Sequence, residues 1–144
     1  MDVGESLTAH FGGRHLVRVT RREFDWNFSF GDAVASGLSA ECPWRIIHAN
    51  GIAFASSDDG HQFGLAAPLD GEKVALSLLG EKPIERVAIR SDTGDLSIWF
   101  SGNVLLEILN VSSGYEGWNI GIPRLSIVAT GGGGLAIFAN GHEN

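Results

Sequence analysis

The chain has 144 residues, of which 44% are hydrophobic and 19% are charged, and its net charge is −7 at pH 7. These values describe one soluble globular domain over residues 1–144 and exclude a disordered or fibrous chain. The acidic balance argues against binding to the phosphate backbone of nucleic acid, and no apolar run is long enough to span a membrane. A single cysteine excludes an internal disulfide, and the N-terminus lacks the order of a secretory signal, so we expect a cytoplasmic protein.

Two short helices are expected, one at the start of each half of the chain. Residues 6–11 form the first, and Asp70 is a suitable N-cap for the second, which ends at Gly80. The residues expected to face inward in this second helix are Val74 and Leu78, followed by Ala75 and Leu79.

Alternation of apolar and polar residues predicts several short strands. They are expected over residues 16–21, 38–42, 46–48, 51–55, 84–90, 125–130 and 135–139. Glycine makes up 20 of the 144 residues, about twice its average share. This frequency predicts many tight turns between the strands.

The clearest strand pattern lies within segment 94–120. Apolar residues recur at every second position from Leu96 to Phe100, which is typical of a strand buried on one face. Ser101-Gly102-Asn103 predicts a turn, after which residues 104–109 return as a second apolar strand. We expect these two strands to pair as a hairpin, and a similar hairpin to follow the first strand of the chain.

The two halves of the chain resemble each other in sequence. A shift of 70 residues places Val17 on Val87, and a shift of 74 places Trp44 on Trp118. Any two β-rich halves align to some degree, but these matches keep their order and include a tryptophan pair. We interpret them as an internal pseudo-repeat.

The pseudo-repeat predicts the architecture. Its two copies are residues 1–66 and 72–144, with four extra residues around 112–115 in the second copy. We expect a mainly β, β-rich α+β fold. In it, two repeated helix-plus-meander units form antiparallel sheets that pack as a sandwich or an open barrel.

The run Gly131-Gly132-Gly133-Gly134 superficially resembles a phosphate-binding loop. Such loops lead into a helix whose N-terminus holds the anion, whereas residues 135–138 have the pattern of a strand. We therefore expect the glycines to serve a turn with positive φ, or the close approach of another backbone segment.

Other reactive side-chain types also have structural explanations. Asp58, Asp59 and His61 share one loop, but a metal site needs further donors, and Asp-Gly beside a strand end is a common turn. The loop is nevertheless a suitable place for a binding surface. Cys42 has no adjacent positive group and is expected to be a structural thiol. We expect no metal and no cofactor.

Two related segments each place a glutamate near a tryptophan. Glu41 precedes Trp44 in the first half, and Tyr115-Glu116 precede Trp118 in the second. The two glutamates are candidates for an acid–base pair of a hydrolase. The favoured interpretation is that each tryptophan fills half of the core, and that each glutamate accepts backbone or indole hydrogen bonds at its rim.

The motifs GDLSIWF, LEIL, SSGYEGWNI and ATGGGGLAIF together resemble those of a family of small bacterial proteins of unknown function. The first-half segments FDWNFSFGDA, ECPWRI and SSDDGHQFGL resemble the companion motifs, so the likeness covers most of the chain. The positions that mark the family correspond here to Gly114, Tyr115, Glu116 and Trp118, together with the glycine run. Proteins of this size and type are often associated with immunity to bacterial toxins.

We therefore expect a non-enzymatic protein-interaction module, and the resemblance implies an immunity protein that binds and blocks a toxin. An acidic face can cover the basic working surface of such a partner. The expected binding residues are Glu41, Trp44, Asp58, Asp59, His61, Tyr115, Glu116 and Trp118. Two alternatives stay open: a small-molecule-binding or hydrolytic enzyme with a cleft between the repeats, and a self-associating module that dimerises through a sheet edge. No nucleic acid or membrane partner is expected.

Overall fold

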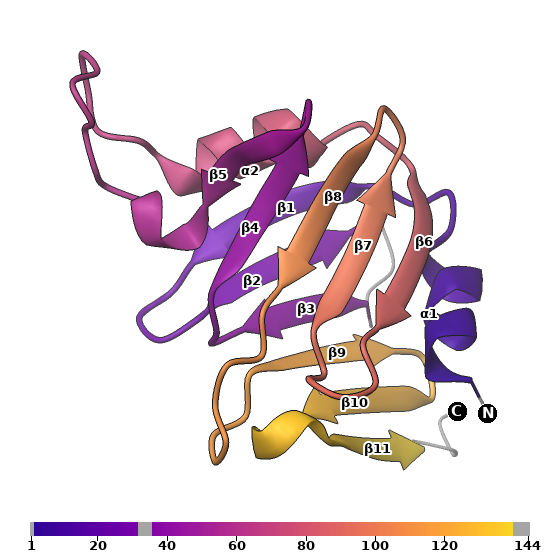
Figure 1. Cartoon of the computed structure of the whole chain (residues 1–144). Helices are drawn as coiled ribbons and strands as arrows, with labels where there is room; N and C mark the ends of the chain where they lie inside the picture. Colours follow the sequence, from indigo (N-terminus) through magenta and orange to yellow (C-terminus); the bar gives the residue numbers. More distant parts are fainter. Residues whose placement is uncertain (1, 32–35, 140–144) are drawn as a thin grey trace.

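A computed structural model describes residues 2–31 and 36–139 of the chain, and in it the strands form two antiparallel sheets that face each other (Figure 1). Sheet A contains, in spatial order, β1 (Leu16–Arg21), β2 (Trp26–Phe30), β3 (Gly37–Ala40), β9 (Trp118–Ile122), β10 (Leu125–Ala129) and β11 (Leu135–Ala139). Sheet B contains β5 (Gly51–Ala55), β4 (Trp44–His48), β8 (Val104–Ile108), β7 (Leu96–Phe100) and β6 (Ile84–Ile89). The expected β-rich α+β fold with two packed antiparallel sheets is confirmed, and the sheets do not close into a barrel.

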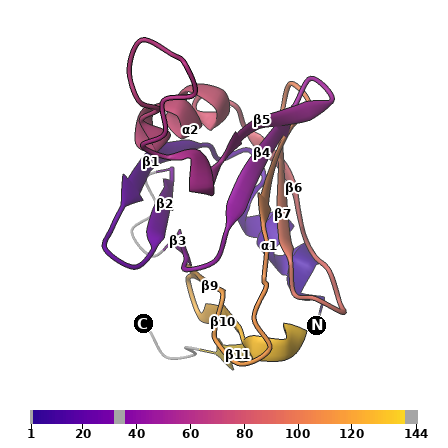
Figure 2. The same cartoon turned by 60° about the vertical axis from the view of Figure 1, so that its left-hand side comes forward.

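Each half of the chain contributes strands to both sheets. The first half places β1–β3 in sheet A and β4–β5 in sheet B, and the second half places β6–β8 in sheet B and β9–β11 in sheet A (Figure 2). The halves meet where β3 pairs with β9 and where β4 pairs with β8. The sheets are therefore shared between the halves, and neither half completes a sheet by itself.

The pairing registers correct the sequence alignment of the halves. Val19 lies opposite Phe28, and Val87 lies opposite Ile98, so Val87 corresponds to Val19 and not to Val17. Both first strands also carry a β-bulge against the second strand. For this first strand the alignment was wrong by two residues, because the β6–β7 connection has six residues and the β1–β2 connection has four. The pseudo-repeat itself stays a prediction, and its outermost positions, 1 and 140–144, lie outside the described residues.

The strand β9 is absent from the predicted strands. Its sequence, WNIGI, alternates correctly, and Trp118 and Ile120 are buried. However, Gly121 lies inside it and Pro123 follows it directly, and both residue types weaken a strand assignment. Pairing with β3 and β10 on its two sides overrides this weak propensity.

The core lies between the two sheets and is filled by the inward-facing side chains of alternate positions. Trp44 and Trp118 are each 1% exposed, as expected of tryptophans that fill the core. Burial of such a large apolar side chain contributes roughly 2–3 kcal/mol to folding. Trp44 contacts the rings of Trp26 and Phe28 edge to face, with centroids 5.0 and 5.2 Å apart.

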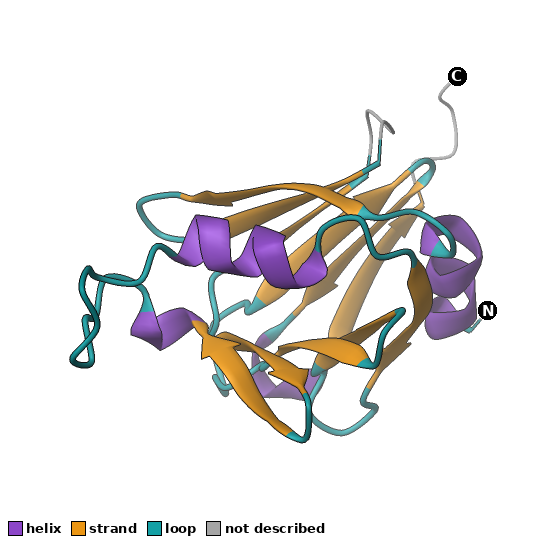
Figure 3. Ribbon diagram, turned by 90° about the horizontal axis from the view of Figure 1, so that it is seen from above, coloured by secondary structure: helices purple, strands orange, loops and turns teal. Residues whose placement is uncertain are grey.

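Two helices close the sides of the sandwich (Figure 3). The helix α1 (Val3–Phe11) packs against β6, and α2 (Gly71–Leu79) packs against β1, so each helix covers the first strand of the other half. Asp70 caps α2 by accepting a hydrogen bond from the amide of Lys73, and Gly80 ends the helix, as predicted. The most deeply buried side chains of α2 are those of Ala75 and Leu79. Those of Val74 and Leu78 are only partly buried. Neither of these helices, within the described residues, is long and apolar enough to cross a membrane.

Candidate functional site

A surface groove lies at the end of the sandwich where the β1–β2, β3–β4 and β8–β9 connections meet, at the lower left of Figure 1. Its volume is about 750 Å³, and an adjoining hollow of about 260 Å³ continues it toward Arg21 and Ser57. We call the two together the loop-end groove. The residues that line both parts are Phe24, Glu41, Cys42 and Pro43.

The loop-end groove exists because equivalent connections differ in length between the halves. The β3–β4 connection has three residues, 41–43, whereas the β8–β9 connection has nine, 109–117. The sequence alignment of the halves predicts four extra residues here, and the structure shows six. The longer connection forms one wall of the groove. Its side chains of Val111 and Tyr115 are 68% and 82% exposed.

A turn at Ser112 shapes this wall. The Ser112 hydroxyl oxygen accepts hydrogen bonds from the amides of Gly114 and Tyr115, at 3.1 and 2.8 Å. The Ser112 carbonyl accepts another from the amide of Gly132, at 2.9 Å. The wall is thereby tied to the glycine run.

The glycine run, residues 131–134, has positive φ angles at Gly132 (85°) and Gly133 (97°) and leads into strand β11. A Cβ atom on Gly133 would lie 2.3 Å from the carbonyl oxygen of Asp92. The prediction that the glycines serve positive φ angles and close backbone approach is therefore confirmed.

Asn110 fixes the base of the same wall. Its side-chain amide donates to the carbonyls of Thr93 and Thr130, at 2.9 and 3.2 Å, and its backbone amide donates to Asp95. It therefore links the β6–β7, β8–β9 and β10–β11 connections. Asn110 was not predicted from the sequence, because a single asparagine after a strand carries no pattern.

The carboxylates of Glu41 and Glu116 face solvent in the loop-end groove. Both residues are exposed, and within the part of the chain that the structure describes neither carboxylate forms a hydrogen bond or an ion pair. The expectation that they accept backbone or indole hydrogen bonds is therefore wrong. The Trp118 indole donates instead to the carbonyl of Gly94 at 2.8 Å, and the Trp44 indole N–H has no acceptor among the described residues.

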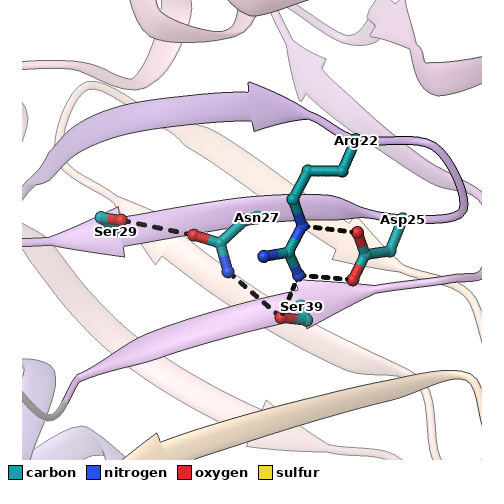
Figure 4. A network of polar contacts seen from close by, with 5 residues as sticks. All are labelled: Arg22, Asp25, Asn27, Ser29 and Ser39. Carbon is teal, nitrogen blue, oxygen red and sulfur yellow. Dashed lines mark hydrogen bonds and ion pairs between the residues drawn. The ribbon is translucent and has the colours of Figure 1, made fainter.

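The arginines at the groove are paired with nearby acids, and Figure 4 shows this for Arg22 and Asp25. Arg22 binds Asp25 through two hydrogen bonds of 2.7 and 2.6 Å, and this contact lowers the pKa of Asp25 below its ordinary value. Arg21 forms an ion pair with Asp59. With both cations paired, the charges without a counter-ion among the described lining residues are those of Glu23, Glu41 and Glu116, so the groove is acidic.

The cluster Asp58, Asp59 and His61 lies outside the loop-end groove. One oxygen of Asp59 accepts from the amide of Gly71 at 2.7 Å and the other binds Arg21, so Asp59 holds its loop to α2 and β1. His61 stacks on Phe63, with ring centroids 5.5 Å apart. In the described ranges no three histidine, cysteine or acidic side chains are grouped to hold a metal ion.

Cys42 lines the groove, but its thiol is not poised for nucleophilic chemistry. Burial, followed by the nearby charges of Asp95 and Glu41, raises the pKa of Cys42 to about 12. Since the thiolate is the reactive form, the side chain is unreactive near neutral pH. This agrees with the structural thiol predicted from the sequence.

The structure thus brings Glu41, Tyr115 and Glu116 into one groove and keeps the other expected binding residues out of it. Phe24, which is 78% exposed in that groove, was not predicted. A signal for it was available, because a large aromatic residue between Glu23 and Asp25 in a turn has no local partner to bury it. No protein-family model, curated protein or solved structure matches the chain.

Proposed function

We propose that this protein is a non-enzymatic interaction module that binds a basic segment of a partner protein in the loop-end groove. The observation that carries the proposal is the combination of two exposed aromatic side chains, Phe24 and Tyr115, with the uncompensated carboxylates of Glu41 and Glu116. The aromatics come from different loops and line the same groove.

Each part of this combination has a physical role in recognition. Large aromatic side chains supply most of the binding energy at many protein interfaces, and their exposure on a free surface marks such sites. Carboxylates without counter-ions favour a cationic partner and increase its rate of association. The groove therefore suits a segment that carries lysine or arginine next to apolar side chains.

A bacterial toxin that acts on nucleic acid is one partner class that fits. Such an enzyme presents a basic working surface to its substrate. The resemblance to small bacterial proteins associated with toxin immunity supports the same assignment, in which this chain covers that surface and blocks it.

A hydrolase is the second candidate, because Glu41 and Glu116 line the same groove. A carboxylic acid that acts as a general acid is usually desolvated by its surroundings. Both of these side chains are exposed, and the groove is open. The geometry therefore favours binding over catalysis.

Affinity capture with matched variants tests the proposal. Immobilised wild-type protein, a Phe24→Ala/Glu116→Lys groove variant and an Ile52→Ala/Glu85→Lys control are each exposed to a lysate of the source organism. The control makes the same type of change at exposed positions outside the groove. We expect the wild type and the control to retain a basic protein that the groove variant loses. Identical capture by all three proteins would contradict the proposal.

A further inference from the structure

Two of the four sheet edges are covered by the chain itself. At the β6 edge, the hydroxyl of Thr8 from α1 contacts both the amide and the carbonyl of Val87, each at 3.0 Å. At the β1 edge, the carboxylate of Glu72 from α2 accepts a hydrogen bond of 2.7 Å from the amide of Arg21. Both helices thus supply polar groups to backbone atoms that an edge strand otherwise leaves open.

The third edge, β5, is irregular. Its pairing with β4 shifts register between Ile46 and Ile47, and the hairpin turn between the two strands has positive φ at Ala49 and Asn50. A bulge twists an edge strand and hinders pairing with another chain. This edge is therefore protected by its shape.

The fourth edge, β11, has none of these protections within the residues that the structure describes. It pairs with β10 in unbroken register over five residues, and no described strand or helix pairs with its outer side. Its sequence, LAIFA, contains no charge and no proline. Ile137 and Phe138, which point to opposite faces, remain 45% and 55% exposed. A regular, apolar, uncovered edge is a template for pairing with another strand.

We propose that β11 pairs antiparallel with β11 of a second copy of this chain, with Ile137 on the two-fold axis. The two sheets A then continue into each other across the dimer. In this register, Leu135 of one copy lies opposite Ala139 of the other, and Ala136 lies opposite Phe138. On either side of the axis a large side chain meets a small one, and at the axis the two Ile137 side chains meet each other, so the strand is complementary to itself in size.

The absence of charge at this edge is compatible with a second copy as the occupant. The chain carries a net charge of −7, so two copies repel each other over most of their surfaces. Neither β11 nor its neighbour β10 contains a charged residue. This edge therefore lets identical acidic chains meet without opposing like charges. The inference is independent of the loop-end groove.

Sedimentation equilibrium at micromolar and submillimolar concentrations tests the dimer. We expect the wild type to dimerise. Phe138→Lys should weaken the dimer by about tenfold or more, because each of the two pairing strands would then carry a lysine. Ile52→Lys, the same type of change on the exposed β5 edge, is the matched control and should leave the dimer intact. A wild-type protein that stays monomeric throughout would overturn the proposal, and so would a dimer unaffected by Phe138→Lys.

Cross-linking provides a readout that does not depend on how Phe138→Lys folds. In a Cys42→Ala background, Ile137→Cys places two thiols opposite each other at the axis, where opposite Cβ atoms lie about 5 Å apart. A short bismaleimide should join the two chains through this position and not through Ile52→Cys. Failure to join Ile137→Cys, or equal joining of both variants, would contradict pairing through β11.

Discussion

Gly131 lies so close to Gly114 that a Cβ atom added to Gly131 would be 2.5 Å from the Gly114 backbone. The reverse does not hold, because a Cβ atom added to Gly114 meets nothing within 4 Å. The contact joins the start of the glycine run to the wall of the loop-end groove. Steric crowding at this contact therefore requires a glycine at position 131 but not at position 114.

This asymmetry predicts the effect of two substitutions. Gly131→Ala should lower the free energy of unfolding by about 1–3 kcal/mol, because the backbone of the wall must move to avoid the new methyl group. Gly114→Ala is the matched control and should change it by less than about 0.5 kcal/mol. Urea unfolding of both variants checks this. Equal effects of the two substitutions would show that the close approach does not hold the wall.

The two core tryptophans should respond differently to replacement by phenylalanine. Trp118→Phe removes the N–H that binds the carbonyl of Gly94 and leaves this buried carbonyl unpaired, whereas the Trp44 N–H has no acceptor among the described residues. We therefore expect Trp118→Phe to be more destabilising than Trp44→Phe by about 1 kcal/mol. Thermal unfolding measured for both variants under one set of conditions tests the difference. The reverse order would contradict the hydrogen-bond assignment.

His10 should make the stability depend on pH. Burial, followed by the charge of Arg14, lowers the pKa of His10 below the 6.5 of the unfolded chain, and its Nε2 lies 2.6 Å from the hydroxyl of Ser36. Between the lowered pKa and 6.5 the unfolded state binds more protons than the folded state. The contribution of neutral His10 is thus fully present above pH 6.5 and is lost as the pH falls through this window.

Urea midpoints measured at pH 7 and at pH 5 provide the test for His10. The wild type should lose more stability between the two values than His10→Gln, which cannot be protonated. A loss of the same size in both proteins would assign the pH dependence to other groups.

Exposed carboxylates that have no partner in the described part of the chain should be dispensable for folding. Glu41→Gln and Glu116→Gln, separately or together, are expected to change the free energy of unfolding by less than about 0.5 kcal/mol. They should nevertheless weaken capture of a basic partner, because charge complementarity is lost. Loss of stability by more than about 1 kcal/mol would show that the carboxylates have structural partners.

Local patterns were enough to predict most of the elements. Apolar alternation located β1, β5 and β11 with their observed bounds, and aspartate caps with terminal glycines located α2. Exchange of strands between the halves was not predictable. Pairing of β3 with β9 depends on contacts between distant segments, and these leave no periodic trace in either strand.

The candidate site was predictable only in part. Glu41, Tyr115 and Glu116 were identified because acids and an aromatic residue stand next to glycine, proline and tryptophan in two related segments. The groove itself depends on the difference in length between two connections, and this becomes visible only when the strands are in register. Asp58, Asp59 and His61 were expected to bind a partner, but the structure places them away from the groove, with Asp59 engaged in holding its loop.

Calorimetric titration of the captured basic partner against the Phe24→Ala/Tyr115→Ala variant tests the central claim most directly. If the loop-end groove is the binding site, loss of its two exposed aromatics should weaken binding by about thirtyfold or more, while Ile52→Ala binds like the wild type. Equal affinity of the double variant and the wild type would contradict binding through this groove.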